Sequence, residues 1–162
     1  METITFMTSL LTFYLKGEIR HEQNFIKLKA PNTILSFIPL GTEKHTVPIN
    51  QISSVGTSFS LLLKNFIVGV IAAFLGLALM GDTVLGGLIV LLLGVSMSIN
   101  SFQTVLTVNT TSGNEFVISF LIFEKSKAEQ AEYQINQLVS HRLDDTNNRQ
   151  QTDRIVDAIN NK

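Results

Sequence analysis

The residue types that most often do chemistry are few in this chain and lie far apart. It has three histidines, His21, His45 and His141, and no cysteine. The histidines lack the spacing of metal ligands, so we expect them to be polar surface residues. The lack of cysteine excludes disulfides, thiolate metal sites and cysteine nucleophiles. We therefore expect no metal site and no cofactor.

Catalytic and nucleotide-binding motifs are also missing from the sequence. It contains no G-x-S-x-G, no G-x-x-x-x-G-K and no G-x-G-x-x-G, which are the signatures of hydrolases, P-loops and dinucleotide-binding turns. Its 12 basic and 13 acidic residues give a net charge of −1, whereas nucleic-acid-binding domains show a basic excess. We expect neither an enzyme nor a nucleic-acid-binding protein.

Apolar residues are concentrated in the middle of the chain. Of the 162 residues, 45% are hydrophobic and only 15% are charged, against roughly 25% charged residues in an average soluble domain. Between Asn65 and Ser101 the single charged residue is Asp82. Each half of this run has about 16–18 residues and would span about 25 Å as a helix, near the low end for a hydrocarbon core of about 30 Å. The sequence predicts a two-helix transmembrane hairpin over residues 61–101.

The tip of this predicted hairpin is formed by Gly81, Asp82 and Thr83, which have turn chemistry. Burial of both helices inside a soluble core is the first alternative, but so small a domain cannot readily enclose helices that are apolar on every face. A single long span is the second, and it would place an unpaired Asp82 at its midpoint. Leu61, Leu62 and Leu63 could extend the first helix.

Small residues recur four positions apart along both halves of the apolar run. The pairs are Gly69 with Ala73, Ala72 with Gly76, and Gly94 with Ser98. This spacing lets two helices approach closely. It could serve packing within the hairpin or packing between two copies of the chain, so a homo-oligomer stays open.

The flanks of the hairpin suggest an orientation. A hairpin places both chain ends on one side, and its tip carries no Lys or Arg, whereas Lys64 lies at its root. The positive-inside rule then places both arms in the cytoplasm. The expected localisation is the cell membrane, as a multi-pass protein with both termini cytoplasmic. Residues 1–15 are too short to span and could form a first strand or a segment on the membrane surface.

The two arms are predicted to be rich in β-strands. In residues 1–60, short apolar stretches are separated by expected turns at Pro31-Asn32 and Gly41-Thr42. After the apolar run, β-branched and aromatic stretches at 102–108 and 115–123 flank a Ser-Gly-Asn turn, which predicts a β-hairpin.

A helical period follows over residues 125–141, with Ser126 as the expected N-cap. Its apolar stripe is formed by Ala128, Ala131, Ile135, Leu138 and Val139. Neither arm is large enough for a core of its own, so we expect residues 1–60 and 102–141 to form one domain. Residues 142–162 are expected to be a flexible polar tail.

The first arm also contains several basic residues: Lys16, Arg20, Lys27, Lys29, Lys44 and Lys64. Glutamates in the same arm largely cancel their charge, so we expect a generic solvated surface. Contact with anionic lipid headgroups is the alternative.

Four stretches of the chain resemble the bacterial pleckstrin-homology-like (PH-like) family. They are Phe25–Leu28, Val47–Val55, the predicted hairpin Phe102–Phe123 and the predicted helix Lys125–His141. Some small membrane proteins of low-GC Gram-positive bacteria interrupt this domain with a transmembrane hairpin at the same place, and the sublancin immunity proteins are the group that this chain resembles most. The resemblance implies an α+β membrane protein, with a seven-strand bent sheet closed by a C-terminal capping helix.

This resemblance also gives the expected function. It implies a small integral membrane protein that acts as an immunity or self-protection factor against a membrane-acting peptide bacteriocin. The alternative is a membrane-tethered PH-like scaffold that binds a protein partner or lipid headgroups at the inner leaflet. The expected partners are the lipid bilayer and either a peptide bacteriocin or a membrane protein.

Overall fold

The computed structural model of the chain describes residues 2–34 and 38–160, with the side chains of 144–151 and 153–160 excepted. Its elements, in chain order, are β1 (Ile4–Met7), β2 (Lys16–Glu22), β3 (Phe25–Ile34), β4 (Ile38–Pro48), the 3₁₀ turn η1 (Ile49–Gln51), β5 (Ile52–Leu61), α1 (Leu63–Leu79), α2 (Val84–Asn100), β6 (Phe102–Thr110), β7 (Glu115–Leu121), the 3₁₀ turn η2 (Ile122–Glu124) and α3 (Lys125–Asn160).

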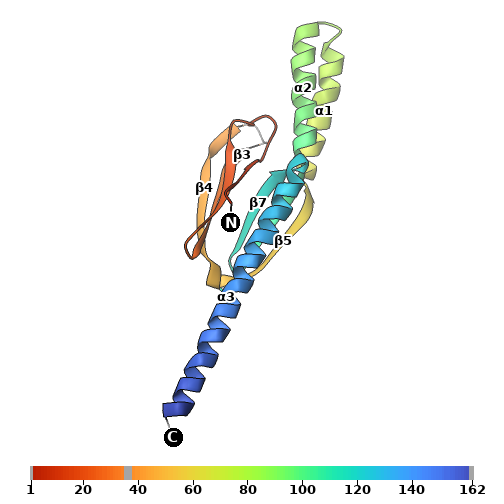
Figure 1. The fold of residues 1–162 in the computed structure, drawn as a ribbon. Coiled ribbons are helices and arrows are strands. Elements are labelled where there is room, and N and C mark those ends of the chain that lie inside the picture. The colour runs from red at the N-terminus through yellow and green to blue at the C-terminus, as the bar shows by residue number, and fades with distance from the viewer. Residues whose placement is uncertain (1, 35–37, 161–162) are drawn as a thin grey trace.

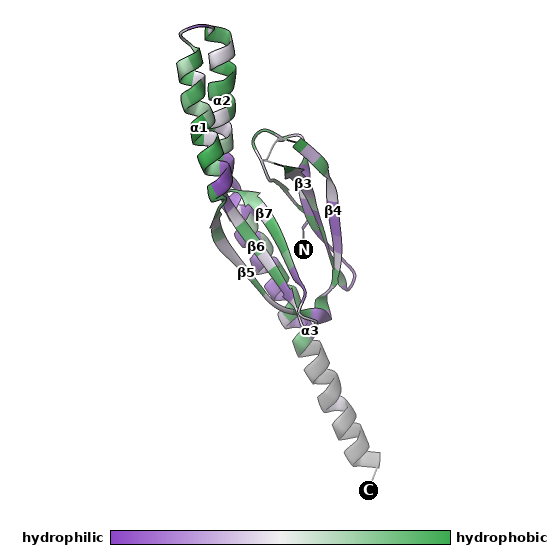
Figure 2. Cartoon of the chain, turned by 180° about the vertical axis from the view of Figure 1, so that it is seen from behind, coloured by the Kyte–Doolittle hydropathy of each residue, from purple (hydrophilic) through white to green (hydrophobic). Residues whose placement is uncertain are grey.

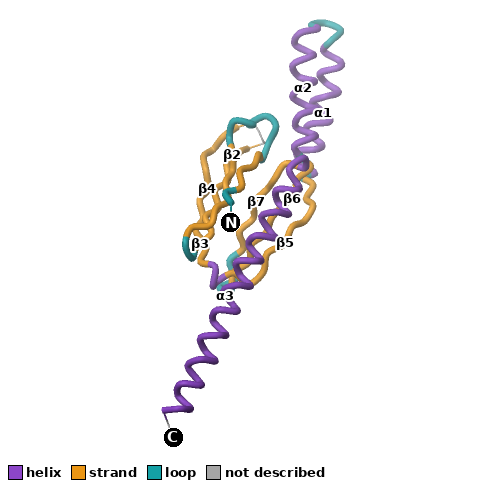
Figure 3. The backbone as a smooth tube through the Cα atoms, viewed as in Figure 1, coloured by secondary structure: helices purple, strands orange, loops and turns teal. Residues whose placement is uncertain are grey.

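The strands form two antiparallel sheets. The first has the order β1-β2-β3-β4 and the second the order β5-β6-β7. The two sheets face each other, and the first half of α3 covers the second sheet (Figures 1 and 3). The single bent sheet of seven strands implied by the resemblance is therefore replaced by a four-stranded and a three-stranded sheet among the described residues.

One hydrophobic core joins the two arms of the sequence. Strands alternate their side chains between two faces, and the inward residues of both sheets meet the apolar stripe of α3. The buried members are Ile4, Phe6, Ile19, Ile26, Leu28, Val47, Ile49, Ile52, Leu106, Val108, Ile118, Phe120, Ala128, Ala131 and Ile135. The ring of Phe6 stacks on that of Phe120 with centroids 4.1 Å apart, which ties β1 to β7. Residues on both sides of the apolar run thus share one core.

Two local predictions are confirmed. Strands β6 and β7 pair as an antiparallel hairpin, and α3 buries Ala128, Ala131 and Ile135 completely. The expected N-cap is wrong, because α3 begins at Lys125 and so contains Ser126 in its first turn. Residues 142–160, expected to be a flexible tail, continue α3 to Asn160. No Gly or Pro interrupts this stretch, so nothing in the sequence stops the helix.

The turns expected at Pro31-Asn32 and Gly41-Thr42 are also wrong. Both pairs lie inside the long strands β3 and β4. The pairing of β3 with β4 continues through both residue pairs, with a register shift between Asn32 and Thr33 and a positive φ of 145° at Gly41. The pairing of β2 with β3 ends at Lys29, so at Pro31 and Asn32 strand β3 is paired only with β4, and proline and a bulge are tolerated at such an edge.

The apolar run forms a helical hairpin that projects from one end of the β-rich part (Figure 1). Helices α1 and α2 lie side by side over their length and are coloured mainly hydrophobic in Figure 2. The chain leaves and returns at adjacent points, since Leu61 pairs with Phe102 and the amide of Leu62 donates to the carbonyl of Ser101 at 2.9 Å. This adjacency allows the insertion between β5 and β6 without separating them.

The transmembrane prediction is contradicted. Within residues 2–34 and 38–160, none of the helices has the combined length and apolarity that crossing a membrane requires. Helices α1 and α2 have 17 residues each, which gives about 25 Å at 1.5 Å per residue, while a span needs about 20 residues. Of the three leucines that could extend the first helix, Leu63 begins α1, whereas Leu62 is its N-cap and Leu61 ends β5. The integral membrane fold class, the membrane and transmembrane assignment, and the multi-pass localisation with cytoplasmic termini are corrected accordingly.

The N-terminal segment resolves into a strand followed by a compact loop. Ile4–Met7 forms β1 and pairs with β2, Ile4 lying opposite Ile19. Residues 8–15 follow without regular strand pairing. Of the two forms expected for residues 1–15, the strand is therefore the one present at 4–7.

Candidate functional site

Glycines form the contact between α1 and α2. A methyl group on Gly69 would lie 2.6 Å from the hydroxyl of Ser98, and one on Gly94 would meet the backbone of Ala73 and lie 2.7 Å from the carbonyl of Gly69. Gly69 and Gly94 are buried although most of the hairpin is exposed. Close backbone approach therefore joins the two helices, as small residues permit.

Most small residues noted in the sequence lie along this contact. Gly76 faces the backbone of Leu91 and the carbonyl of Gly87, and Ala72 is half-buried. Sequence reasoning missed Gly87, whose added methyl group would lie 2.6 Å from the amide of Met80. The signal that could have found it is a spacing of seven residues, which separates Gly69 from Gly76 and Gly87 from Gly94 and returns to nearly the same face of a helix.

The tip residues Gly81, Asp82 and Thr83 are exposed and form the tight turn between the helices. The amides of Asp82 and Thr83 donate to the carbonyl of Leu79 at 3.2 and 2.9 Å. The carbonyl of Thr83 in turn accepts from the amide of Gly87 at 2.9 Å, which begins α2. The tip is thus held by backbone hydrogen bonds and leaves the Asp82 carboxylate at the surface.

The outer surface of the hairpin is apolar on every side. Side chains that do not face the partner helix stay exposed, among them Phe74 at 68% and Leu85 at 73%. A shallow groove of about 280 Å³ runs between the two helices, with an almost entirely apolar lining. Its lining residues are Val70, Ala73, Phe74, Leu77, Val95, Ser98 and Ile99. Monomeric proteins rarely expose so large a contiguous apolar patch unless it binds something.

The root of the hairpin contains a buried polar cluster. The Asn100 side chain accepts a hydrogen bond from the Leu10 amide at 2.8 Å and donates one to the Ser9 hydroxyl at 3.0 Å. Gln103 donates to the Asn100 carbonyl at 3.3 Å. Asn100 and Ser9 are almost completely inaccessible. Sequence reasoning missed this cluster, because Leu10 and Asn100 are 90 positions apart in the chain.

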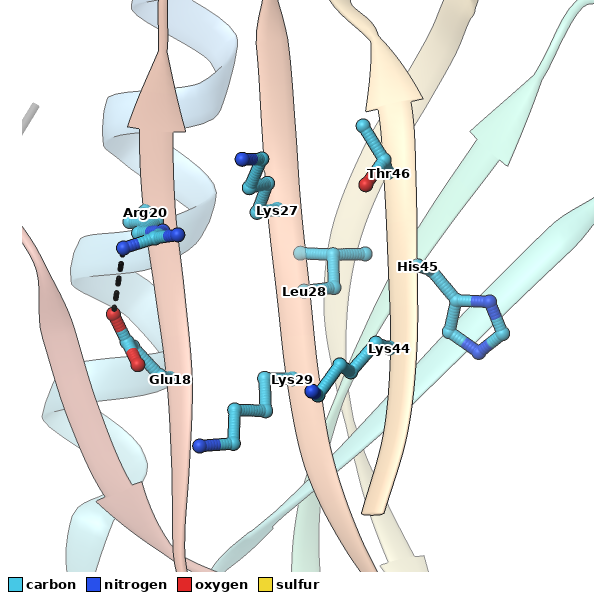
Figure 4. Close-up of a pocket in the computed structure, with 8 residues that line it drawn as sticks. All are labelled: Glu18, Arg20, Lys27, Leu28, Lys29, Lys44, His45 and Thr46. Carbon is cyan, nitrogen blue, oxygen red and sulfur yellow. Dashed lines mark ion pairs between the residues drawn. The ribbon is translucent and has the colours of Figure 1, made fainter.

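The outer face of the first sheet carries most of the basic side chains of the first arm. They surround a shallow hollow of about 480 Å³ (Figure 4). Cross-strand neighbours place Glu18, Lys29 and Lys44 in one row, and Arg20, Lys27 and Thr46 in the next. Lys64 is not part of this face, because it lies in the first turn of α1.

Ion pairs on this face are confined to its β2 side. Glu22 lies 2.5 Å from Lys27 and 3.6 Å from Arg20, and Glu18 lies 3.9 Å from Arg20. The hydrogen bond and charge of Lys27 lower the pKa of the Glu22 carboxyl below its ordinary value; desolvation opposes them, and the charge of Arg20 lowers the pKa to a lesser extent. Lys29 and Lys44 make no ion pair within the described part of the chain.

The three histidines stay apart in the fold. His21 lies in β2 and His141 in α3, while the ring of His45 lies 4.8 Å from Phe116 and 3.8 Å from a carboxylate oxygen of Glu43. Across residues 2–34 and the described side chains of 38–160, no three His, Cys, Asp or Glu residues gather where they could hold a metal ion.

Comparisons with known proteins give no relative for this chain. No protein-family model matches it, and no match to a curated protein or to a solved structure reaches significance.

Proposed function

We propose that this chain is a non-enzymatic immunity factor, which protects the cell that produces it by binding an apolar peptide bacteriocin on the α1–α2 hairpin. The observation that carries the proposal is the exposed apolar surface of the hairpin with the groove between its helices. A surface of this kind recognises its ligand by burying apolar area, worth roughly 25 cal/mol per Å².

The charge of the hairpin narrows the class of ligand. From Leu63 to Asn100 the only charged residues are Lys64 at the root and Asp82 at the tip. A ligand lying along the groove would therefore find no ionic partner between these two points, and a charge facing the groove would lose its hydration without compensation. An apolar or amphipathic peptide that presents one uncharged face fits this surface, in the manner of a helix bound in a groove.

The β-rich part supports a PH-like assignment for the domain that carries the hairpin. Two antiparallel sheets of four and three strands enclose one core, and α3 closes it. This arrangement agrees in general outline with a PH-like domain, the family that four stretches of the sequence resemble. That resemblance is our reason for preferring immunity over other binding roles. Since one fold serves many functions, the assignment adds no ligand of its own.

The proposal is tested by protection of a sensitive bacterium. The chain is expressed in that host, and the tolerated dose is measured for a panel of membrane-acting peptide bacteriocins. We expect a higher tolerated dose for at least one peptide, together with binding of that peptide to the purified chain by calorimetry. Unchanged sensitivity to every peptide in the panel would count against the function.

A matched pair of variants locates the activity. Phe74→Asp places a charge in the groove and should abolish both protection and binding. Phe123→Asp changes an equally exposed phenylalanine outside the hairpin, 70% exposed against 68% for Phe74, and should leave both unchanged. Sedimentation of the purified chain completes the test. A stable dimer that buries the groove would show that a second copy is its occupant and would contradict peptide binding there.

A further inference from the structure

The first sheet has a long free edge at β4. Strand β4 is the last in the order β1-β2-β3-β4, and within the described part of the chain its only hydrogen-bonded neighbour is β3. Every residue from Ile38 to Thr46 in this strand is exposed. The stretch between Pro39 and Pro48 is free of proline, so its amides can donate to another strand. Such an edge is a template for pairing with an additional extended chain.

Two lysines that make no ion pair with any described residue lie beside this edge. Lys44 of β4 is directly opposite Lys29 of β3, and Figure 4 shows both side chains in the same hollow, with His45 pointing away from them. Directly opposed like charges destabilise a sheet. Glu18 lies opposite Lys29 on β2, but its carboxylate is paired with Arg20 at 3.9 Å, and Glu22 is paired with Lys27 and Arg20. Neither Lys29 nor Lys44 has a carboxylate within ion-pair distance among the described residues.

We propose that β4 binds an extended acidic segment of a partner protein, which pairs with its free edge and places carboxylates beside Lys44 and Lys29. The inference goes beyond the proposed function, because it uses no residue of the hairpin. A side chain opposite Lys44 on an added strand would have its Cβ about 5 Å away, within reach of an ion pair. Lys29 lies on β3, one further strand spacing of about 4.8 Å from the added strand, so a longer acidic side chain on that strand could reach it.

The position of the charges favours a strand over a membrane surface as the occupant. A lone edge lysine protects a sheet against unwanted pairing, but that role needs no second lysine opposite it. A flat anionic surface would meet the whole face, in which Glu18 and Glu22 offset Arg20 and Lys27. Among the described residues, Lys29 and Lys44 are two lysines without an ion pair next to the free edge, where an added strand would lie, whereas Lys16, also without one, lies in β2 opposite Met7 of β1.

The test uses a fluorescein-labelled peptide of alternating glutamate and valine with blocked ends, titrated with the full chain at low salt and followed by fluorescence anisotropy. We expect saturable binding that weakens as sodium chloride is added. The double variant Lys29→Gln/Lys44→Gln should bind at least about tenfold more weakly. The control Lys16→Gln/Lys64→Gln removes the same charge away from β4 and should bind like the unchanged chain.

A second peptide separates strand pairing from charge attraction. Replacing each valine by proline keeps the glutamates but removes amides that a sheet needs, so binding should fall at least about tenfold. Equal binding of the two peptides, or equal binding by Lys29→Gln/Lys44→Gln, would overturn the proposal. Lys44→Glu gives a further check, since this variant should prefer a peptide of alternating lysine and valine. Retention of the original preference would also overturn it.

Vesicles of equal parts phosphatidylcholine and phosphatidylglycerol test the other source of negative charge. If β4 binds an acidic strand, the Lys29→Gln/Lys44→Gln change should weaken peptide binding more than vesicle binding. Vesicle binding that depends on these two lysines, without binding of the peptide, would assign the face to a membrane surface and reject the strand. Circular dichroism of each variant confirms that it is folded before titration.

Discussion

The Asn100 side chain at the end of α2 accepts a hydrogen bond from the backbone amide of Leu10, 90 positions earlier in the chain, at 2.8 Å. The same side chain donates to Ser9, so its amide group is satisfied on both sides. Asn100 is fully buried, and a buried amide without partners is costly. The hairpin is therefore joined to the segment after β1 by a polar contact as well as by its covalent connection to β5 and β6.

Replacing Asn100 by alanine should destabilise the chain by about 2–4 kcal/mol, because it leaves the Leu10 amide without its acceptor and opens a cavity. Urea denaturation followed by circular dichroism measures the free energy of unfolding. Asn109→Ala is the matched control. Its side chain makes one exposed hydrogen bond to Ser54, so a loss below about 1 kcal/mol is expected. Equal losses in the two variants would contradict the role of the buried contact.

Gly94→Ala should weaken the packing of α1 on α2. The added methyl group would meet the backbone of Ala73 and the carbonyl of Gly69, which cannot move aside as a flexible side chain can. We expect a net loss of about 1–3 kcal/mol, even though alanine favours a helix by about 1 kcal/mol over glycine. Thermal unfolding of Gly81→Ala provides the comparison, since a methyl group there meets only the Ala78 carbonyl at 3.6 Å. A stabilised Gly94→Ala chain would rule out close packing at this point.

The ion pair of Glu22 with Lys27 should be visible in the titration of the glutamate. Lys27 is the main cause of the lowered pKa of Glu22, and the charge of Arg20 is a weaker cause in the same direction. A carboxyl whose pKa is lowered on folding stabilises the fold above its ordinary pKa of about 4.3 and loses that contribution as the pH falls through the lowered value. In Lys27→Gln, the pKa measured from the carboxyl carbon chemical shift should rise toward the ordinary value. A pKa unchanged by this substitution would remove Lys27 as the cause.

Glu124 connects the start of α3 to β1. Its carboxylate accepts from the Met7 amide at 2.5 Å and from Lys127 at 2.6 Å, and Lys127 also donates to the Thr5 carbonyl at 2.9 Å. Glu124→Gln should cost about 1–3 kcal/mol, because Glu124 is buried and Lys127 loses its ionic partner. Hydrogen exchange of the Met7 amide should accelerate.

Glu129→Gln serves as the control for Glu124→Gln. Glu129 forms an exposed pair with Lys125 one helical turn away, at 3.4 Å. Exposed pairs of this spacing contribute about 0.3–0.5 kcal/mol. Faster exchange at Met7 in the control would show that the effect is general to α3 and would exclude a specific contact between Glu124 and β1.

Features encoded over short distances could be predicted from the sequence. The alternation and turn residues around Gly113 predict the β6–β7 hairpin, and the helical period predicts the buried stripe of α3. The break at Gly81-Asp82-Thr83 likewise marks the turn between α1 and α2. In each case neighbouring residues carry the signal, because the period of side chains along a helix or strand is a local property.

Other features depend on which distant segments meet. Pro31 and Gly41 look like turn residues in the sequence, but β3 and β4 pair through them because the ladder continues on both sides. Each apolar helix has 17 residues, as its half of the run predicts, but Leu61 does not extend α1 because it is held in β5 by its partner Phe102. Pairing between strands outweighed local preference at both places, as tertiary context often does.

The candidate sites also include features that neighbouring residues encode and features that depend on contacts between distant segments. The sequence by itself determined that this chain carries an apolar hairpin with small residues at helical spacing, because composition and period are properties of neighbouring residues. Only the tertiary structure decided that Asn100 meets Leu10 and that Lys29 faces Lys44 across two strands. The contact between the lysines follows from the register of β3 and β4, and that of Asn100 follows from the position at which the hairpin rejoins the β-rich part. A one-residue change of register would move every side chain of a strand to the opposite face.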